Sequence, residues 1–388
     1  MEIPFNRRHI AKNELKFIRE ILLDDNNKSH EKFLMSASGL IQNFSNANFV
    51  HLTNSCTGAL EVSSHLCELS KGDEVIMPSF TFSSTANPVV LRGATPVFVD
   101  VSLHDINISM EKVEEAITRK TKAIFVVHYG GYMCDIKHAS KIAKKNNLFL
   151  VEDAAQAVGS KREGISPGEI SDFSAFSFHN TKNITCGEGG AITLNCERMS
   201  RNAEIIIEKG TDRTNFLRGE IDKYTWRKAG SSYVAADICV AQLNAQLEEL
   251  QIINSKRRKI WQRYHIGMCD IETRGYILRP KYVDECEING HIYFFLLPDE
   301  EVRQKYIEFM RAKGIQVQTH YRCLHSTKFA NQNCRTQGVL SNTERVEKTL
   351  IRLPIYPSLT DSQSEKVIKH TRDFFGVSTS FNSSYFER

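Results

Sequence analysis

The feature that most constrains the fold is an alternation, from about residue 48 to residue 195, of short β-rich runs with helical stretches. Most of the β-rich runs are continuously apolar rather than alternating, as in TKAIFVVHYG at 121–130. Strands of this kind are covered on both faces, which is typical of a parallel sheet flanked by helices. We therefore predict a mostly parallel α/β sheet.

The predicted elements of this half follow one another along the chain. The expected strands are residues 48–55, 73–78, 95–101, 121–130, 147–154, 173–178 and 189–195. The expected helices are residues 57–69, 110–118 and 135–146.

After residue 195 the pattern changes to that of an α+β region. The expected elements are a helical stretch over 235–268, an apolar run at 291–298, a helix over 300–314, the segment 315–321 and a helix near 361–375. We predict a large α/β domain at 1–250 and a smaller domain at 251–388, which suits the usual size of domains. The last residues, from 376 on, are expected to be frayed.

Charge and cysteine usage exclude several classes of protein. The net charge is only +4 and no basic block stands out, so we expect no nucleic-acid or membrane partner. The N-terminus does not resemble a signal peptide, and no apolar run reaches the roughly 18 residues of a spanning helix. The ten cysteines form no C-x-x-C pair, so we expect no metal site, no disulfides and a cytoplasmic protein.

The segment TNSCTGAL at 53–60 lies between a predicted strand and a predicted helix. Ser55, Cys56 and Thr57 are small or hydroxylated, so backbone N–H groups at the helix start could bind an anion. The alternative is an ordinary helix N-cap. The G-x-G-x-x-G fingerprint of nicotinamide enzymes is absent from this segment.

Two further residues follow predicted strands. Asp153 ends an apolar strand, where an unpartnered carboxylate would cost several kcal/mol and a cation would stabilise it. It could instead cap a helix. Phe82 lies in a polar turn after a strand, where it could stack on a planar ring or belong to the core.

The segment FSAFSFHNTKNITCGEGG, at 173–190, delivers Lys182 into a polar, glycine-ended turn after Ser177 and His179. One ligand explains all four segments: a phosphorylated, cationic heteroaromatic aldehyde, namely pyridoxal 5′-phosphate. The helix start would bind its phosphate, Asp153 its ring nitrogen and Phe82 its ring face. Lys182 would form a Schiff base with the aldehyde.

The ordered segments SCTGAL, GDEVIMPSFTFSSTAN, VEDAAQAVGS and FSFHNTKN with GEGG resemble the aminotransferases that act on nucleotide-linked keto-sugars (the DegT/DnrJ/EryC1/StrS type). The resemblance covers the chain from IPFN to about residue 375. It implies a fold-type-I, pyridoxal-phosphate-dependent transferase, with a large, mostly parallel sheet domain of the seven-stranded type and a smaller C-terminal α+β domain. The segments EDAAQA, EKGTDR and DKYTWRKAGSSY are most similar to dTDP-4-dehydro-6-deoxyglucose 4-aminotransferases.

The resemblance also assigns roles to residues. Lys182 would be the Schiff-base lysine and proton shuttle, with His179 beside it, and Gln156 would contact the ring hydroxyl. The phosphate would be bound by Thr57 and Ser177, with the backbone at Ser55 and Cys56. Candidate substrate contacts, each with an equally plausible structural role, are Lys209, Arg213, Arg227, His320 and Tyr321.

Two features depart from the family pattern. Ser232 replaces an asparagine that, in relatives, reaches the cofactor phosphate of the partner subunit. The segment 24–35 lacks the glycines that many relatives have there. The contact at Ser232 and part of the pocket wall are therefore expected to differ.

The resemblance implies a homodimer with shared active sites that transfers an amino group from L-glutamate to a dTDP-linked keto-sugar. Attack at C4 of dTDP-4-dehydro-6-deoxy-D-glucose would give a 4-amino-4,6-dideoxy sugar of gluco or galacto configuration for surface polysaccharide of the O-antigen type. Transamination at C3 and a non-enzymatic role on the same fold remain alternatives. A sugar 3-dehydrase is disfavoured because those relatives carry histidine where this chain has Lys182.

Overall fold

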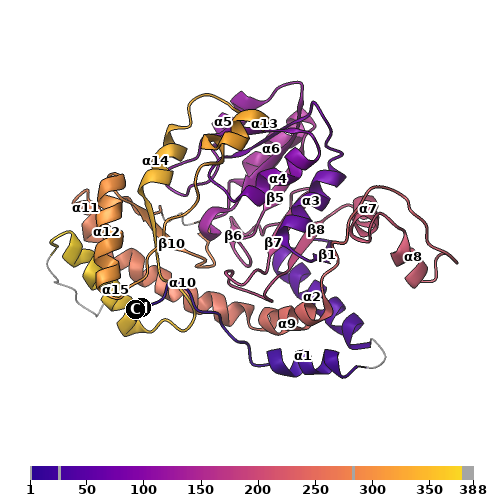
Figure 1. Cartoon of the computed structure of the whole chain (residues 1–388), viewed down its shortest axis with the longest axis horizontal. Coiled ribbons are helices and arrows are strands. Elements are labelled where there is room, and N and C mark those ends of the chain that lie inside the picture. The colour runs from indigo at the N-terminus through magenta and orange to yellow at the C-terminus, as the bar shows by residue number, and fades with distance from the viewer. Residues whose placement is uncertain (1, 25–27, 282–284, 378–388) are drawn as a thin grey trace.

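The computed structural model describes residues 2–24, 28–281 and 285–377 (Figure 1). Its centre is an eight-stranded sheet in the order β1-β8-β7-β5-β4-β2-β3-β11. These strands are β1 (Phe49–Thr53), β2 (Glu74–Pro78), β3 (Thr95–Val99), β4 (Thr121–Val127), β5 (Phe149–Asp153), β7 (Phe173–Ser177), β8 (Gly190–Leu194) and β11 (Arg335–Thr336). Strand β8 is antiparallel to both neighbours and the other pairings are parallel. The prediction of a mostly parallel sheet is confirmed.

The central strands are apolar on both faces. In β2, Val75 and Met77 join one buried cluster, whereas Ile76 joins another. In β4, Phe125 packs with the first cluster and Ile124 with the second. Successive side chains of a strand point to opposite faces, so both faces of this sheet need a covering layer of helices.

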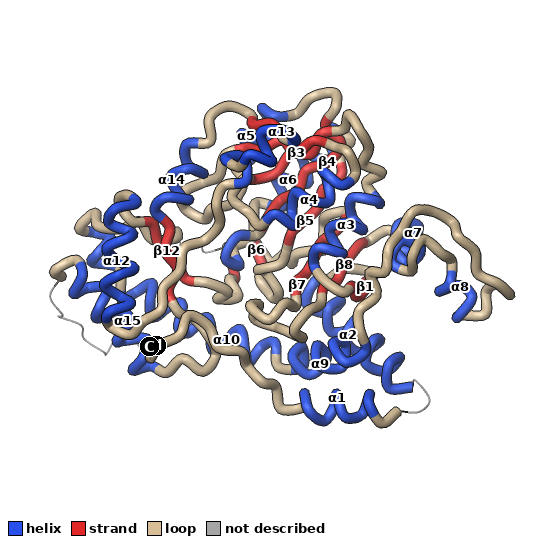
Figure 2. Tube along the Cα trace, in the orientation of Figure 1, coloured by secondary structure: helices blue, strands red, loops and turns tan. Residues whose placement is uncertain are grey.

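Helices provide both layers, as Figure 2 shows. Helices α3 (Cys56–Leu66), α4 (Ser83–Leu91) and α7 (Glu197–Ile207) pack on the face of Val75. Helices α5 (Met110–Ala116) and α6 (Ile136–Asn146) pack on the other face. Helix α4 was not expected, because its sequence SSTANPVVL is rich in residues typical of turns. It forms because one side of it is buried against the sheet.

A third group of helices packs beside β7 and β8. It consists of α1 (Glu14–Leu22), α2 (Lys28–Ser45), α9 (Asp237–Glu248) and α10 (Leu250–Gly267). The helical stretch expected at 235–268 is thus two helices, which meet at Glu249. Of the glycine-free segment 24–35, residues 25–27 lie outside the described residues and Lys28 begins α2. None of the described helices combines the length and apolar character that a bilayer crossing requires.

The C-terminal third forms its own small sheet. Strands β10 (Tyr293–Leu296) and β12 (Leu350–Leu353) are antiparallel, and α12 (Glu300–Ala312), α14 (Ser341–Thr349) and α15 (Asp361–Phe374) lie near them (Figure 1). The shorter elements are β6 (Lys161–Arg162), β9 (Cys286–Glu287), α8 (Arg213–Leu217), α11 (Cys269–Thr273), α13 (Lys328–Asn333) and 3-10 turns at Tyr129–Gly131 and Leu324–Ser326. The end predicted to be frayed lies, from residue 378, outside the described residues.

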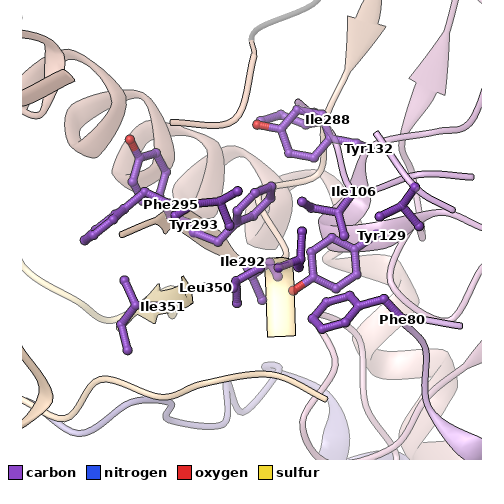
Figure 3. Packing of buried hydrophobic residues seen from close by; sticks show 14 of the residues in the cluster. Phe80, Ile106, Tyr129, Tyr132, Ile288, Ile292, Tyr293, Phe295, Leu350 and Ile351 are labelled. Atoms are coloured by element: carbon purple, nitrogen blue, oxygen red, sulfur yellow. The ribbon is translucent and has the colours of Figure 1, made fainter. Parts of the chain in front are cut away.

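One buried cluster joins the two parts of the chain (Figure 3). Phe80 and Tyr129 follow strands of the large sheet, whereas Ile292 and Leu350 belong to the C-terminal third. In addition, β11 pairs with β3 at the edge of the large sheet. The division of the chain at residue 250 stays a prediction, because the two parts share one core.

Residues 208–234, which include α8, form an arm that extends away from the sheet (Figure 1). Several large apolar side chains of this arm are solvent-exposed: Phe216, Leu217, Tyr224 and Trp226. Trp226 is 80% exposed. Exposed apolar side chains that gather on one segment are typical of an interaction surface.

Candidate active site

A cavity of about 740 Å³ lies where the parallel strands end. Ends of strands at the carboxyl edge of an α/β sheet are the usual ligand site of such folds. The lining includes most of the predicted site residues: Ser55, Cys56, Thr57, Phe82, Asp153, Gln156, Ser177, His179, Lys182, His320 and Tyr321. The structure thus brings together residues from four separate segments and from the C-terminal third.

The turn from β1 into α3 forms one wall of the cavity. Ser55 is the N-cap of α3, and its Oγ accepts a hydrogen bond from Gly58 N at 3.0 Å. Thr57 Oγ1 donates to Ser84 Oγ at 2.8 Å. A Cβ at Gly190 would lie 2.3 Å from the Ser55 carbonyl carbon, so only glycine allows this approach. Ser55 therefore caps the helix, as the alternative interpretation expects, and the helix start lines the cavity, where its N–H groups can bind an anion.

Cys56 is the first residue of α3. Burial raises the pKa of its thiol well above the usual range, with the charge of Asp153 adding to the effect. The thiol is therefore protonated and acts as a small side chain rather than as a nucleophile. All ten cysteines lie in the described residues, and each has a free thiol.

Asp153 is the last residue of β5 and is 6% exposed. Its Oδ2 accepts a hydrogen bond from Thr85 Oγ1 at 2.7 Å, and its Oδ1 accepts one from Ala155 N at 3.1 Å. Thr85 Oγ1 also lies 2.8 Å from Thr81 Oγ1. Two neutral donors orient this carboxylate, and no cation of the described residues forms an ion pair with it. A cationic ligand would complete the site.

Lys182 lies in the turn after β7, where its backbone N–H donates to the His179 carbonyl at 2.9 Å. Burial lowers the pKa of its amine below the usual range, and the charge of Arg352 acts in the same direction. Cys56 and Asp153 oppose the shift. A lowered pKa favours the neutral amine, which is the form that reacts with an aldehyde or accepts a proton.

The turn that carries Lys182 is held by hydrogen bonds of the next residue, Asn183. Asn183 Nδ2 donates to Asn254 Oδ1 at 2.9 Å and to the Asn289 carbonyl at 3.1 Å. Asn183 Oδ1 lies 3.0 Å from His291 Nδ1. All of these groups are buried. The backbone of the turn that carries Lys182 is therefore held by a hydrogen-bonded network.

Ser177 and His179, at and just after the end of β7, differ in burial. Ser177 is the buried last residue of the strand. His179 is partly exposed, with Nδ1 at 2.9 Å from Thr181 Oγ1 and Nε2 at 3.5 Å from Glu188 Oε1. His179 thus lines the cavity, but its polar contacts are with its own loop.

The opposite wall carries aromatic and amide groups. Gln156 Oε1 accepts a hydrogen bond from Gly130 N at 2.7 Å, and its Nε2 donates to Tyr321 Oη at 3.0 Å. His320 stacks on Tyr321 with ring centroids 3.8 Å apart. Phe82 is the N-cap of α4 and is 59% exposed, with its ring 6.3 Å from that of Tyr321. An exposed ring at a cavity rim is available for stacking.

Four predicted residues lie outside this cavity, in the arm 208–234. Lys209 Nζ is 3.1 Å from Glu208 Oε2, and Arg213 Nη1 is 3.6 Å from Glu208 Oε1. Arg227 pairs with Asp212 at 2.9 Å. The exposed Ser232 offers its carbonyl to Asn54 Nδ2 at 3.1 Å. The roles predicted for these four residues stay predictions.

Sequence reasoning missed several residues of the site. These are Ser84, Thr85, Asn183, Arg257, His291 and Arg352. Thr85 and Asn183 lie within segments that were singled out, but their neighbours in sequence are also polar, so nothing local set these two side chains apart. The remote Arg352 carries no local signal either.

These groups fit pyridoxal 5′-phosphate. The Ser55–Thr57 turn offers helix N–H groups and hydroxyls for a phosphate, and the buried Asp153 carboxylate lacks the cation that a pyridinium nitrogen would supply. Lys182 lines the same cavity with an amine of lowered pKa. The donor set thus matches the phosphate, the ring nitrogen and the aldehyde.

Comparisons with known proteins agree with this chemistry. The chain matches the DegT/DnrJ/EryC1/StrS aminotransferase family over residues 9–372, and it belongs to this family. MJ1066, an uncharacterized protein of Methanocaldococcus jannaschii, is 33% identical over 336 residues, which are 85% of this chain and 86% of that protein.

Solved structures share the fold. The PLP-form of Spr1654 from Streptococcus pneumoniae has a TM-score of 0.86 at 24% identity, covering 98% of this chain and 100% of that chain. DesV of S. venezuelae, solved in complex with a ketimine intermediate, has a TM-score of 0.85 at 25% identity, covering 100% of this chain and 99% of that chain. The protein is thus a sugar aminotransferase whose cofactor is pyridoxal 5′-phosphate.

Proposed function

We propose that the protein transfers the amino group of L-glutamate to C4 of dTDP-4-dehydro-6-deoxy-D-glucose. The product would be dTDP-4-amino-4,6-dideoxy-D-glucose or its galacto epimer, made in the cytoplasm for a surface polysaccharide. The observation that carries amino transfer is the placement of Lys182 and Asp153 on one cavity. The choice of nucleotide and of C4 is supported by the segments EDAAQA, EKGTDR and DKYTWRKAGSSY.

The cofactor, when bound, supplies an aldehyde that reacts with amines and a ring that accepts an electron pair. Lys182 Nζ would hold the aldehyde before the donor arrives. Once released, the neutral amine would accept the proton from the donor's α-carbon. It would then deliver this proton to the cofactor carbon that carried the aldehyde. Because the pKa of this amine is lowered, the neutral form is present at a lower pH than for an ordinary lysine.

Asp153 would keep the ring nitrogen protonated. Its two neutral donors, Thr85 and Ala155 N, fix both carboxylate oxygens without neutralising their charge. Gln156 would contact the ring hydroxyl, and Phe82 would cover the ring face. In the second half of the cycle the same groups would serve the ketone of the sugar.

The arm 208–234 would complete the active site of a second copy of the chain. Its exposed Phe216 and Trp226 suit a surface that is covered by a partner. The predicted diphosphate-binding residues Lys209, Arg213 and Arg227 lie on this arm, outside the cavity of their own chain. A homodimer would bring them to the substrate. Light scattering of Trp226→Asp is expected to show a weakened dimer, whereas an unchanged dimer would contradict this role.

The experiment that tests the proposal is a product assay. The purified protein is incubated with dTDP-4-dehydro-6-deoxyglucose, L-glutamate and cofactor, and the sugar ring is read by proton NMR. An amine at C4 is expected, and the H4 couplings would separate an axial galacto amine from an equatorial gluco one.

Three other results would contradict the proposal. An amine formed only from the 3-keto isomer would identify a C3-aminotransferase. Turnover only with another nucleotide would reject dTDP. Bound cofactor without turnover of any keto-sugar would favour a non-enzymatic role.

A further inference from the structure

Arg352, on β12, lines the cavity but has no role in the chemistry described above. Its Nη2 donates to the Thr319 carbonyl at 2.7 Å and to Gln318 Oε1 at 3.4 Å. Its Nε is buried and has no hydrogen-bond partner among the described residues. No carboxylate within the described part of the chain forms an ion pair with it. The Nε donor of this guanidinium therefore lacks an acceptor within the described part of the chain.

The N-terminal segment encloses this arginine. The ring of Phe5 lies 4.8 Å from the guanidinium carbon. Phe5 N donates to Gln316 Oε1 at 2.9 Å, and Gln316 N donates to the Ile3 carbonyl at 2.9 Å, so the ring is held by main-chain contacts. A cation under an aromatic ring is partly desolvated, which strengthens its interaction with a bound anion.

Other charged groups of the cavity are already engaged. Asp153 is held by Thr85 and Ala155, and the exposed Glu188 lies near His179. Arg257 donates from Nε and Nη2 to the carbonyls of Gly290 and His291, at 3.1 and 2.8 Å. Arg352 differs from Arg257 at its Nε, which is buried without an acceptor among the described residues, whereas the Nε of Arg257 is hydrogen-bonded.

We propose that Arg352 binds the α-carboxylate of the amino-acid donor. The proposal rests on the proposed function. An α-amino acid bears its carboxylate on the same carbon as the amine, and that amine must reach the aldehyde that Lys182 would hold. A guanidinium fork matches a carboxylate in a bidentate manner. The burial that lowers the pKa of Arg352 also disfavours its free cation, so a bound carboxylate compensates a cost that the empty cavity carries.

A sugar-linked diphosphate is the other anion in the reaction, and it fits this position less well. It carries two phosphates and continues into a nucleotide, so it needs several cations near an open surface. Lys209, Arg213 and Arg227, on the exposed arm, suit that requirement better than one arginine beneath Phe5.

The test separates the two halves of the reaction. Arg352→Gln and Arg352→Lys are compared with Arg345→Gln, a control at an exposed arginine of α14. The half-reaction of the pyridoxal form with glutamate is followed by cofactor absorbance. We expect its efficiency to fall about 100-fold in Arg352→Gln and about tenfold in Arg352→Lys, which keeps the charge but loses the fork. The control is expected to match the wild type.

Two further readouts exclude a merely structural role. The KM for the keto-sugar nucleotide is expected to be unchanged in both variants. The Kd of glutarate, which has carboxylates but no amine, is expected to weaken in Arg352→Gln when titrated by cofactor absorbance. Phe5→Leu, which removes the ring but keeps the arginine, is expected to weaken glutamate by a few-fold.

Specific outcomes would overturn the proposal. A raised KM for the sugar nucleotide with unchanged glutamate kinetics would assign Arg352 to the diphosphate. Unchanged kinetics with both substrates would leave Arg352 without a ligand. A wild-type protein whose cofactor is not converted by any α-amino acid would overturn the proposed function, and this proposal with it.

Discussion

The cavity has two sides that are built in different ways. The sheet side consists of residues at strand ends, namely Ser55–Thr57, Asp153, Ser177 and Lys182. The C-terminal side consists of His320, Tyr321 and Arg352, which follow or lie on elements of the C-terminal third. On the sheet side the strand ends and the turns that follow them fix the backbone that carries each group. On the C-terminal side the positions depend on contacts between side chains, such as His320 on Tyr321.

This difference suggests a division of labour. The sheet side holds the groups that match the invariant part of the reaction, the cofactor. Under the proposed function, the C-terminal side would face the part that changes, which is the donor and the sugar. Substitutions on the sheet side are therefore expected to affect every substrate equally, whereas those on the C-terminal side should affect substrates selectively.

The largest effect is expected for Lys182→Ala, which removes the amine that holds the aldehyde and moves the proton. Turnover is expected to fall by about 10⁵-fold or more. Lys145→Ala, at an exposed lysine of α6, is the control. Steady-state assay and cofactor absorbance give the readout, and a retained lysine-bound absorbance band in Lys182→Ala would contradict the assignment.

The next largest effect is expected for Asp153→Asn. The side chain keeps its size and one of its acceptors, so folding should be nearly intact. The kcat is expected to fall about 10²- to 10³-fold with every donor and acceptor, because the ring nitrogen loses its counter-charge. Normal turnover would show that the ring is placed elsewhere.

Thr85→Val tests how the sheet side orients that carboxylate. It removes the 2.7 Å hydrogen bond to Asp153 Oδ2 while keeping the shape of the side chain. We expect about a tenfold loss of kcat, as is common for groups that orient a functional residue. In the Thr85→Val, Asp153→Asn double variant the losses should not add, because both act through one carboxylate. Full additivity would separate Thr85 from Asp153.

On the C-terminal side, His320 should make the free energy of unfolding depend on pH in the acid range. Burial lowers the pKa of His320 well below its ordinary value of 6.5, and the charge of Arg352 acts in the same direction. Below about pH 6.5 the unfolded chain therefore binds more protons than the folded one, so the free energy of unfolding falls as the pH drops. In urea titrations His320→Gln should reduce this slope by up to about 1.4 kcal/mol per pH unit. An unchanged slope would show that folding does not lower the pKa of His320.

The smallest effect is expected for Phe82→Leu, which removes an exposed ring from the cavity rim. Loss of an aromatic stack is worth about 0.5–1.5 kcal/mol, so the Kd of the cofactor should rise by about three- to tenfold. Equilibrium dialysis would measure it. An unchanged Kd would indicate that another group covers the ring.

The sheet and its site were largely predictable because both follow from local patterns. The run TKAIFVV predicted β4, and polar residues directly after such runs predicted Asp153 and the position of Lys182. Helix α4 was missed because tertiary burial overrides the turn-forming character of SSTANPVVL. Thr85 was missed with it, since its bond to Asp153 spans 68 residues of sequence.

The C-terminal side was much less predictable. His320 and Tyr321 were reached only through resemblance, and Arg352 was not reached at all. Its position depends on pairing between β10 and β12 and on Phe5, which is 347 residues away in the chain. No local pattern encodes contacts at that separation. The roles of Lys209, Arg213, Arg227 and Ser232 likewise stay predictions that rest on resemblance.

The most direct test of the account is to locate the lysine that holds the cofactor. The protein saturated with pyridoxal 5′-phosphate is reduced with borohydride, digested and analysed by peptide mass spectrometry. The account predicts the pyridoxyl group on Lys182, in the peptide that contains FSFHNTKN, and on no peptide of the Lys182→Ala variant. Attachment to another lysine would contradict the site, as would stoichiometric attachment that persists in Lys182→Ala.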